Sequence, residues 1–288
     1  MRMILSTKTK VFLAGLAYRL IAGGRWLIGK NNQVTVRRGG LNWSLDLDEG
    51  IDFSIYLLGA FERSTVETLQ RLVKPGDVVF DIGANIGAHT LGLARSAGAN
   101  GRVFAIEPTD FAFRKLTNNL ALNPELQART FARQIFLAAE ASAPLQQEIY
   151  SSWPLEGTDR VHPKHRGRLA TTQAATVDTL DHFAERQGIT RLDLIKLDVD
   201  GHELPVLLGG RDVLRKFRPI LVMEMSPYIH AENHHNFAEL VALLRDAGYT
   251  LQNAANLKAV PLDAAALEKF IPDGSSINVI ARPSPPPE

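Results

Sequence analysis

The stretch VVFDIGANIG, residues 78–87, determines the fold class of this chain. Its first five residues have the composition of a buried strand, and Gly83 and Gly87 then form a turn before an apolar helical segment at 89–96. A strand, a glycine-rich turn and a helix in this order form the first unit of nucleotide-binding α/β folds. The stretch therefore predicts an open α/β sheet whose ligand lies beyond the carboxyl ends of its strands.

Outward from this stretch, short buried strands alternate with amphipathic helices, which is typical of a mostly parallel sheet with helices on both faces. We expect a hairpin at 34–36 and 43–47, and a helix at 64–73 that begins with a capping box of Ser64 and Glu67. The further strands are expected at 103–106, 130–140, 192–197, 220–224, 249–252 and 277–280, and the further helices at 111–122, 203–208 and 237–247.

The segment 145–176 interrupts this pattern with two X-Pro dipeptides and a basic run at 164–168. We interpret it as an insertion beside the ligand site. The Pro-rich end of the chain has nothing to bury, so we expect it to be disordered. These boundaries predict an N-terminal extension of helix and hairpin at 1–63, a ligand-binding α/β domain at 64–282 and a tail at 283–288.

Composition excludes several classes of function. With 45% hydrophobic and 22% charged residues, the chain has the make-up of a globular protein with an ordinary core. It contains no cysteine, which excludes disulfides, thiolate metal sites and cysteine nucleophiles. A reducing compartment suits such a chain, so we expect it in the cytoplasm.

The N-terminal segment differs in charge from the remainder. Residues 1–40 hold eight Lys or Arg and no acidic residue, whereas the other 248 residues hold 24 basic and 31 acidic residues, a net charge of −7.

The apolar stretch at 11–28 contains Arg19 and Arg25, so it is not a spanning helix, and no signal-peptide cleavage site follows it. Helical spacing aligns Leu13, Leu16, Leu20, Leu27 and Ile28 in one stripe. We expect a helix that packs on the domain; the alternative is a peripheral anchor at the inner face of the membrane.

The glycine turn and the residues around it indicate the ligand. A dinucleotide fingerprint requires a second glycine where this chain has Asn85, and Asp81 at the strand end would repel phosphates but could neutralise an ammonium group. Glu107, after the next strand and 20 residues past Gly87, has the spacing of a carboxylate that accepts ribose hydroxyls. A nucleoside that carries an amino acid and no phosphate fits both features, and S-adenosylmethionine is such a molecule. We expect Asp81, Gly83, Asn85, Gly87 and Glu107 to bind it.

A second polar cluster follows the buried strand at 192–197. Asp198, Asp200, His202 and Glu203 come at its carboxyl end, where they should face the same pocket as the glycine turn. Methylation of a hydroxyl requires that the acceptor lose a proton, and Asp198 and His202 are our candidates for the base. We interpret Glu203 as a first-turn helix charge. We assign no metal site, although Mg²⁺ held by Asp198, Asp200 and Glu224 stays an open alternative.

Read together, these residues resemble the FkbM-type methyltransferases, a branch of the class I S-adenosylmethionine-dependent enzymes. The resemblance extends in order over residues 41–282. The matching segments are 46–62, 74–77, 81–87, 105–108, 118–123, 176–180, 195–203, 207–210 and 219–224. The chain departs from the family pattern at Asp200, where the family usually has Glu, and at His202, where a small residue is usual.

The resemblance implies a Rossmann-like, doubly wound sheet of seven strands and O-methylation of a sugar, a polyketide or a related small metabolite or glycan. Two alternatives stay open: an NAD-dependent oxidoreductase on a similar sheet, and a non-catalytic lipid- or glycan-binding module that keeps the fold. We expect no nucleic-acid partner, because the basic residues gather at the N-terminus and at 164–168 with few aromatics between them.

Overall fold

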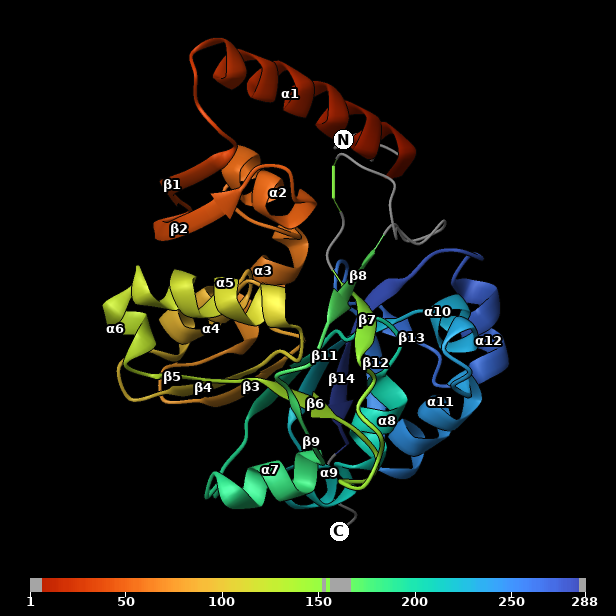
Figure 1. The fold of residues 1–288 in the computed structure, drawn as a ribbon. Helices are drawn as coiled ribbons and strands as arrows, with labels where there is room; N and C mark the ends of the chain where they lie inside the picture. The colour runs from red at the N-terminus through yellow and green to blue at the C-terminus, as the bar shows by residue number, and fades with distance from the viewer. Residues whose placement is uncertain (1–6, 152–153, 156–166, 285–288) are drawn as a thin grey trace.

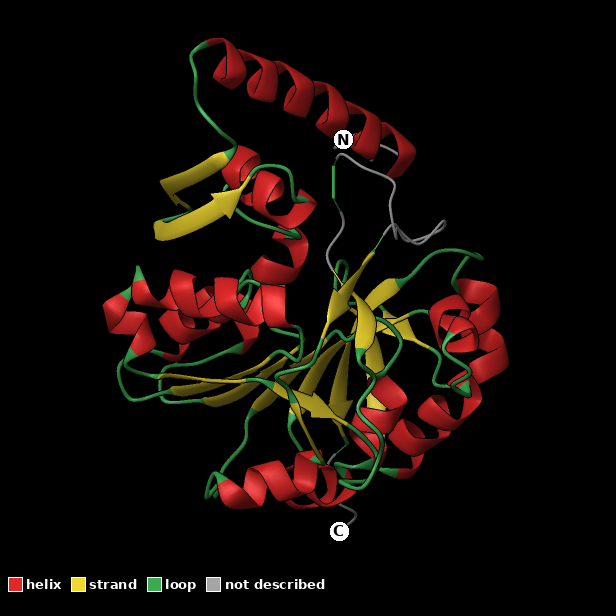
Figure 2. Ribbon diagram, viewed as in Figure 1, coloured by secondary structure: helices red, strands yellow, loops and turns green. Residues whose placement is uncertain are grey.

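The computed structural model describes residues 7–151, 154–155 and 167–284, and it contains the expected doubly wound α/β sheet (Figures 1 and 2). The main sheet has the strand order β13-β12-β14-β11-β10-β3-β4-β5. The strands are β3 (Val78–Ile82), β4 (Arg102–Ile106), β5 (Thr130–Arg133), β10 (Leu194–Leu197), β11 (Ile220–Met225), β12 (Tyr249–Asn253), β13 (Ala259–Val260) and β14 (Ile277–Pro283).

The main sheet has eight strands, so the expected number of seven was wrong. The additional strand, β13, contains only two residues and pairs antiparallel with β12 at the sheet edge. Two residues are too few to show the alternation of apolar and polar side chains by which a strand is recognised in a sequence.

The pairing of the strands distinguishes this sheet from a dinucleotide-binding one. Strands β11, β10, β3, β4 and β5 run parallel, whereas β14 lies antiparallel between β11 and β12. The dinucleotide-binding fold has six strands in the order 3-2-1-4-5-6 without such a reversed insertion. Since β3 connects to β4 on one side and neighbours β10 on the other, the switch point of the sheet lies at the carboxyl end of β3.

Side chains of successive strand residues point to opposite faces, and helices cover both. Val79 and Val103 pack with α3 and α4, and α5 covers the sheet next to them. Phe80, Phe104 and Ile195 face the opposite way, toward α7, α8, α9, α11 and α12. The helices of the domain are α3 (Arg63–Leu72), α4 (Thr90–Ala97), α5 (Asp110–Ala121), α6 (Pro124–Gln127), α7 (Leu180–Arg186), α8 (Glu203–Leu208), α9 (Arg211–Phe217), α10 (Pro227–Glu232), α11 (Phe237–Asp246) and α12 (Ala264–Phe270).

The N-terminal part contains the expected hairpin, formed by β1 (Gln33–Arg38) and β2 (Leu41–Asp46), and two helices, α1 (Thr7–Leu27) and α2 (Gly50–Leu58). The hairpin, α2 and α5 share one apolar core. The expected capping box at the start of α3 was wrong: the helix begins at Arg63, with Glu62 as the N-cap residue in the left-handed region, φ 44°. Glu62 thus holds the N-cap position assigned to Ser64, but its side chain caps no backbone N–H and accepts instead from the Thr65 hydroxyl.

The chain between β5 and α7 differs most from expectation. The strand expected at 130–140 is divided: β5 stays in the main sheet, whereas β6 (Ile135–Leu137) pairs with β9 (Thr176–Asp178). Inside the irregular segment, β7 (Glu148–Ser151) and β8 (Arg168–Thr171) form an antiparallel hairpin. Its basic run at 164–168 and the C-terminal tail at 283–288 lie mostly outside the described residues.

Candidate functional site

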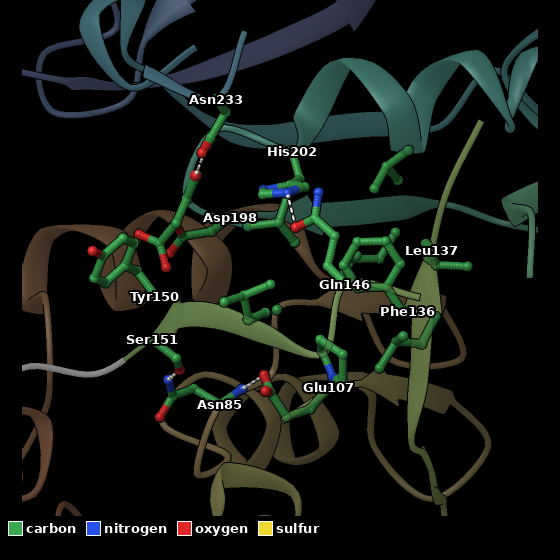
Figure 3. A pocket seen from close by; sticks show the side chains of 18 of the residues that line it. Asn85, Glu107, Phe136, Leu137, Gln146, Tyr150, Ser151, Asp198, His202 and Asn233 are labelled. Atoms are coloured by element: carbon green, nitrogen blue, oxygen red, sulfur yellow. Dashed lines mark hydrogen bonds between the residues drawn. The ribbon is translucent and has the colours of Figure 1, made fainter. Parts of the chain in front are cut away.

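A cavity of about 240 Å³ lies at the switch point of the sheet, at the carboxyl ends of β3, β4 and β10. Its wall includes the apolar strand residues Ile82, Ile106 and Ile135, and β7 covers it on the side away from the sheet. Figure 3 shows the polar side chains that reach it from the glycine turn, from β7 and from the loop after β10. Ligands of open α/β sheets bind at this position.

The glycine turn closes one side of the cavity. Gly83 has φ 78°, and a Cβ atom at this residue would lie 1.8 Å from the carbonyl oxygen of Asp198. Only glycine allows the turn after β3 to come this close to the end of β10. Gly87, with φ 90°, does not line the cavity; its Cα instead lies against Leu116 of α5, to which a Cβ would approach within 3.0 Å.

Asn85 and Glu107 connect the two turns at this edge of the sheet. Asn85 has a left-handed backbone, φ 48°, and its N–H donates to Glu107 Oε2 over 2.9 Å. The backbone N–H and the hydroxyl of Thr109 donate to the other Glu107 oxygen, over 2.9 and 2.5 Å. Both residues line the cavity, with Asn85 between Glu107 and Ser151 (Figure 3). Burial raises the pKa of Glu107, while these donors act in the opposite direction.

Asp81 lies apart from this cavity. It alternates with Ile82 along β3, so its side chain points to the α4 face of the sheet, where the Thr90 hydroxyl donates to it over 2.6 Å. The carboxylate is fully buried, which raises its pKa, and Lys196 counteracts that shift. Asp81 therefore supports the glycine turn from the helix side and does not line the cavity that contains Glu107.

Lys196 of β10 is a buried charged residue beside the site that the sequence analysis missed. It is the register partner of Asp81 on the neighbouring strand, and its ammonium group lies 3.5 Å from Asp81 and 3.6 Å from Asp198. It also donates to the carbonyl oxygen of Gly83 over 2.8 Å. Burial would lower the pKa of Lys196, but Asp198, Asp81 and Glu62 together raise it, so the group stays a cation. The signal in the sequence was a single charged residue within a buried strand.

Asp198 and His202 both line the cavity. The Asp198 side chain is 32% exposed, so it is accessible to a bound molecule. His202 Nε2 lies 3.0 Å from Gln146 Oε1 (Figure 3). Backbone groups of Val199 and Asp200 also bond to this ring and oppose the lowering of its pKa. Burial lowers the pKa of His202, and the neighbouring His235 adds to this effect, which favours the neutral imidazole.

Three carboxylates meet beside this pair. Asp198, Asp200 and Glu224 have oxygen atoms within 4.8 Å of one another, so the structure does bring together the residues of the open Mg²⁺ alternative. Burial and the nearby Asp198 raise the pKa of Glu224. The ammonium group of Lys196, 3.6 Å from Asp198, already supplies a positive charge there. We assign no metal to this cluster.

Glu203 and His230 have a structural role. Glu203 is buried, accepts from the Val199 N–H over 3.1 Å and lies 3.0 Å from His230 Nε2. The contact joins α8 to α10 and fixes the loop that carries Asp198 to His202. The side chain of His230 is fully buried.

The segment interpreted as an insertion supplies part of the cavity wall, which the sequence could not assign residue by residue. The cavity-lining residues from this segment are Gln146, Glu148, Ile149, Tyr150, Ser151 and Leu169. Four-residue strands with mixed polar and apolar side chains give no clear periodic signal. Phe136, Asn233 and Ile229 were also missed, because they approach the cavity only through the tertiary fold.

A doubly wound sheet, a tight glycine turn and a buried carboxylate after the second strand are typical of nucleotide-binding α/β proteins. The family model described as the Methyltransferase FkbM domain matches residues 81–251, more than half of the chain. The chain belongs to this family. The matched region contains each of the predicted site residues from Asp81 to His202.

Curated relatives are distant. Hexuronic acid methyltransferase AglP of Haloferax volcanii is 28% identical over 163 residues, which cover 56% of this chain and 61% of that protein. The match thus spans less than two thirds of the archaeal relative. The 31-O-demethyl-FK506 methyltransferase FkbM of Streptomyces tacrolimicus is 29% identical over 201 residues, 62% of this chain and 75% of that protein.

Solved structures with similar folds include a SAM-dependent O-methyltransferase from Thermotoga maritima, with a TM-score of 0.43 and 14% identity, covering 92% of this chain and 83% of that one. A putative rRNA methylase from Clostridium thermocellum has a TM-score of 0.45 and 13% identity, covering 77% and 95%.

Proposed function

We propose that this protein transfers the methyl group of S-adenosylmethionine to a hydroxyl oxygen of a small metabolite or glycan. The observation that carries the proposal is the single cavity that joins the glycine turn and Glu107 with Asp198 and His202. A donor site and a proton-accepting site are both required for O-methylation, and membership of the FkbM family supports the same chemistry.

The chemistry of the donor set fits an adenosyl amino acid. A carboxylate has about four lone-pair positions, and three protein donors occupy part of those of Glu107, which leaves it able to accept from a ribose hydroxyl. Gly83 and Asn85 would bind the amino-acid portion. Lys196 donates to the Gly83 carbonyl oxygen and pairs with Asp81, so these two residues stabilise the glycine turn without lining the cavity. When bound, the donor supplies a methyl group that its sulfonium has already activated.

The proton of the acceptor hydroxyl has two candidate receivers. Burial favours the neutral form of His202, and a neutral imidazole has one ring nitrogen that can accept a proton. Asp198 is the second candidate, and its carboxylate lies 3.6 Å from the ammonium group of Lys196. The geometry supports both, so the base is assigned to this pair.

A sugar or polyketide hydroxyl is the proposed acceptor. The printed names of the two curated relatives refer to a hexuronic acid and to a demethylated FK506, and each is a methyltransferase. The acceptor side of the cavity, near Gln146, Tyr150 and Asn233, has polar groups that suit a hydroxylated molecule.

The first experiment is calorimetry with S-adenosylhomocysteine and with NAD. We expect binding of S-adenosylhomocysteine and none of NAD; binding of NAD alone would refute the proposal. Transfer of a labelled methyl group into a fractionated cell extract, followed by mass spectrometry, then identifies the acceptor. Donor binding without transfer to any fraction would instead favour a non-catalytic module.

The second experiment tests the base. Removal of a general base typically lowers the rate by about 10²- to 10⁴-fold. We expect His202→Ala or Asp198→Asn to lower kcat to this extent without weakening donor binding. His182→Ala is the matched control, because this histidine is half exposed and bonds to Asp178 away from the cavity. Because we assign no metal site, we also expect the activity to be unchanged by EDTA.

A further inference from the structure

The N-terminal helix α1 presents apolar side chains on the side that faces away from the protein. Leu20, Trp26 and Leu27 are 71%, 77% and 77% exposed, and Leu16 and Ile28 are also exposed. Large exposed hydrophobic side chains are otherwise few among the described residues: Leu57, Leu58, Leu257 and Phe270. Five of these nine therefore gather within residues 16–28.

The orientation of α1 is fixed by its other side. Tyr18 is buried, its hydroxyl donates to Asp48 over 2.7 Å, and its ring contacts Phe53 of α2 edge-on at 5.7 Å. Ala17, Ile21 and Ala22 pack beside it against the core of the N-terminal part. In Figure 1, α1 lies across the outside of that part, next to β1, β2 and α2.

Helical geometry then determines which residues face outward. At about 100° per residue, Leu16, Leu20 and Leu27 share one line along the helix, roughly opposite Tyr18. We call these three leucines, together with the exposed Trp26 at their side and Ile28 directly after the helix, the outer apolar face. The members of the predicted stripe whose side chains are described, Leu16, Leu20, Leu27 and Ile28, are exposed, and the helix packs through different residues. Contiguous exposed apolar surface of this kind marks an interaction site.

Charge indicates what covers the outer apolar face. Residues 1–40 carry eight Lys or Arg and no acidic residue. Two copies of this segment would repel each other, whereas an anionic surface would attract it. Arg19 is exposed on the same helix as the outer leucines, and a tryptophan next to basic residues suits the boundary between lipid headgroups and acyl chains.

We propose that α1 lies in the surface of an anionic phospholipid bilayer, with the outer apolar face in the headgroup region and the exposed Arg19 and Lys30 on lipid phosphates. Among the helices of the described residues, none is long and apolar enough to cross a membrane. The contact that we propose is peripheral, and each Lys or Arg near the surface contributes to it electrostatically. This proposal does not depend on the chemistry of the cavity.

Vesicle flotation of the full chain tests the proposal. Vesicles of phosphatidylcholine with phosphatidylglycerol should carry the protein upward at least about tenfold better than phosphatidylcholine alone, and high salt should release it. The variant Leu20→Glu/Leu27→Glu should lose this binding. The matched control Leu257→Glu/Phe270→Glu adds the same charge at exposed positions elsewhere and should retain it.

Trp26 gives an independent readout. Its emission should shift to shorter wavelength on addition of anionic vesicles, whereas Trp43 is buried in the core and Trp26→Phe should remove the shift. All variants should have the thermal stability of the wild type, since the changed residues are exposed. Absence of flotation, or equal flotation of the Leu20→Glu/Leu27→Glu variant, would overturn the proposal. So would a dimer in sedimentation that only this variant dissociates, which would make a second copy the partner.

Discussion

Replacement of Lys196 by methionine tests the charge arrangement behind the glycine turn. The substitution keeps an unbranched side chain of similar length and removes the only cation within contact of Asp81 among the described residues. Asp81 would then be a fully buried carboxylate with the Thr90 hydroxyl as its remaining donor. A buried charge without its partner is among the most destabilising changes in a protein core.

The magnitude follows from the geometry. At the 3.5 Å separation of Lys196 and Asp81, Coulomb attraction is about 5 kcal/mol with an effective dielectric constant of about 20. Removal of one partner of a buried pair costs about 3–5 kcal/mol. We therefore expect Lys196→Met to lower the free energy of unfolding by about 3–5 kcal/mol at neutral pH. A second change, Asp81→Asn, removes the orphaned charge and should restore most of this loss.

Urea unfolding at several pH values measures both effects. Burial raises the pKa of Asp81 in the folded state, and loss of Lys196 removes the group that opposes this shift. A group with a raised folded pKa stabilises the fold below its unfolded pKa and loses that contribution as pH rises through the folded value. The loss in Lys196→Met should therefore be smaller near pH 4 than near pH 8. A loss below about 1 kcal/mol, or one that does not change with pH, would refute the reasoning.

Three further predictions concern the site and the core. Glu107→Gln should weaken S-adenosylhomocysteine binding about tenfold to a hundredfold in calorimetry, because a charged hydrogen bond contributes about 1.5–3 kcal/mol; an unchanged Kd would contradict the ribose assignment. Gly83→Ala should destabilise the fold and abolish S-adenosylhomocysteine binding, because the new Cβ would lie 1.8 Å from a carbonyl oxygen. The control is Gly92→Ala in α4, where a Cβ meets nothing within 4 Å. This variant should stabilise the protein by about 0.5–1 kcal/mol in thermal unfolding. Burial lowers the pKa of His89 to about 3, so the fold should lose about 2 kcal/mol as pH falls from about 6.5 to 5, and His89→Leu should remove this part of the pH dependence. An equally steep pH dependence in the variant would exclude His89 as the cause.

Much of the fold could be predicted because its signals are local. The order of strands and helices from residue 78 onward follows from hydrophobic periodicity, and the parallel core of the sheet follows from their alternation. The capping box failed because a Ser and a Glu at the right spacing lie inside α3, while Glu62 begins it. β13 and the β7–β8 hairpin were missed because strands of two to four residues show no reliable alternation.

The site was predicted in part for a related reason. Glu107 and Asp198 follow buried strands, and parallel strands bring their carboxyl ends to one edge, so both reach the cavity. Asp81 was expected beside them, yet its position within β3 directs its side chain to the α4 face of the sheet, away from the cavity. The interpretation of Lys196 required knowledge of which strands are neighbours, since its partner in register is 115 residues away in the chain.

The sequence by itself determined the class of fold, the glycine turn and the two acidic strand ends, because backbone conformation and side-chain alternation are properties of a few consecutive residues. The tertiary structure alone decided which charges meet and which surface stays exposed. The leucine stripe of α1 illustrates the difference: periodicity places these residues on one side of a helix, but the fit of Tyr18 against Asp48 and Phe53 selects the side that packs. Such selection depends on the shape and charge of partners distant in sequence, and no local pattern contains that information.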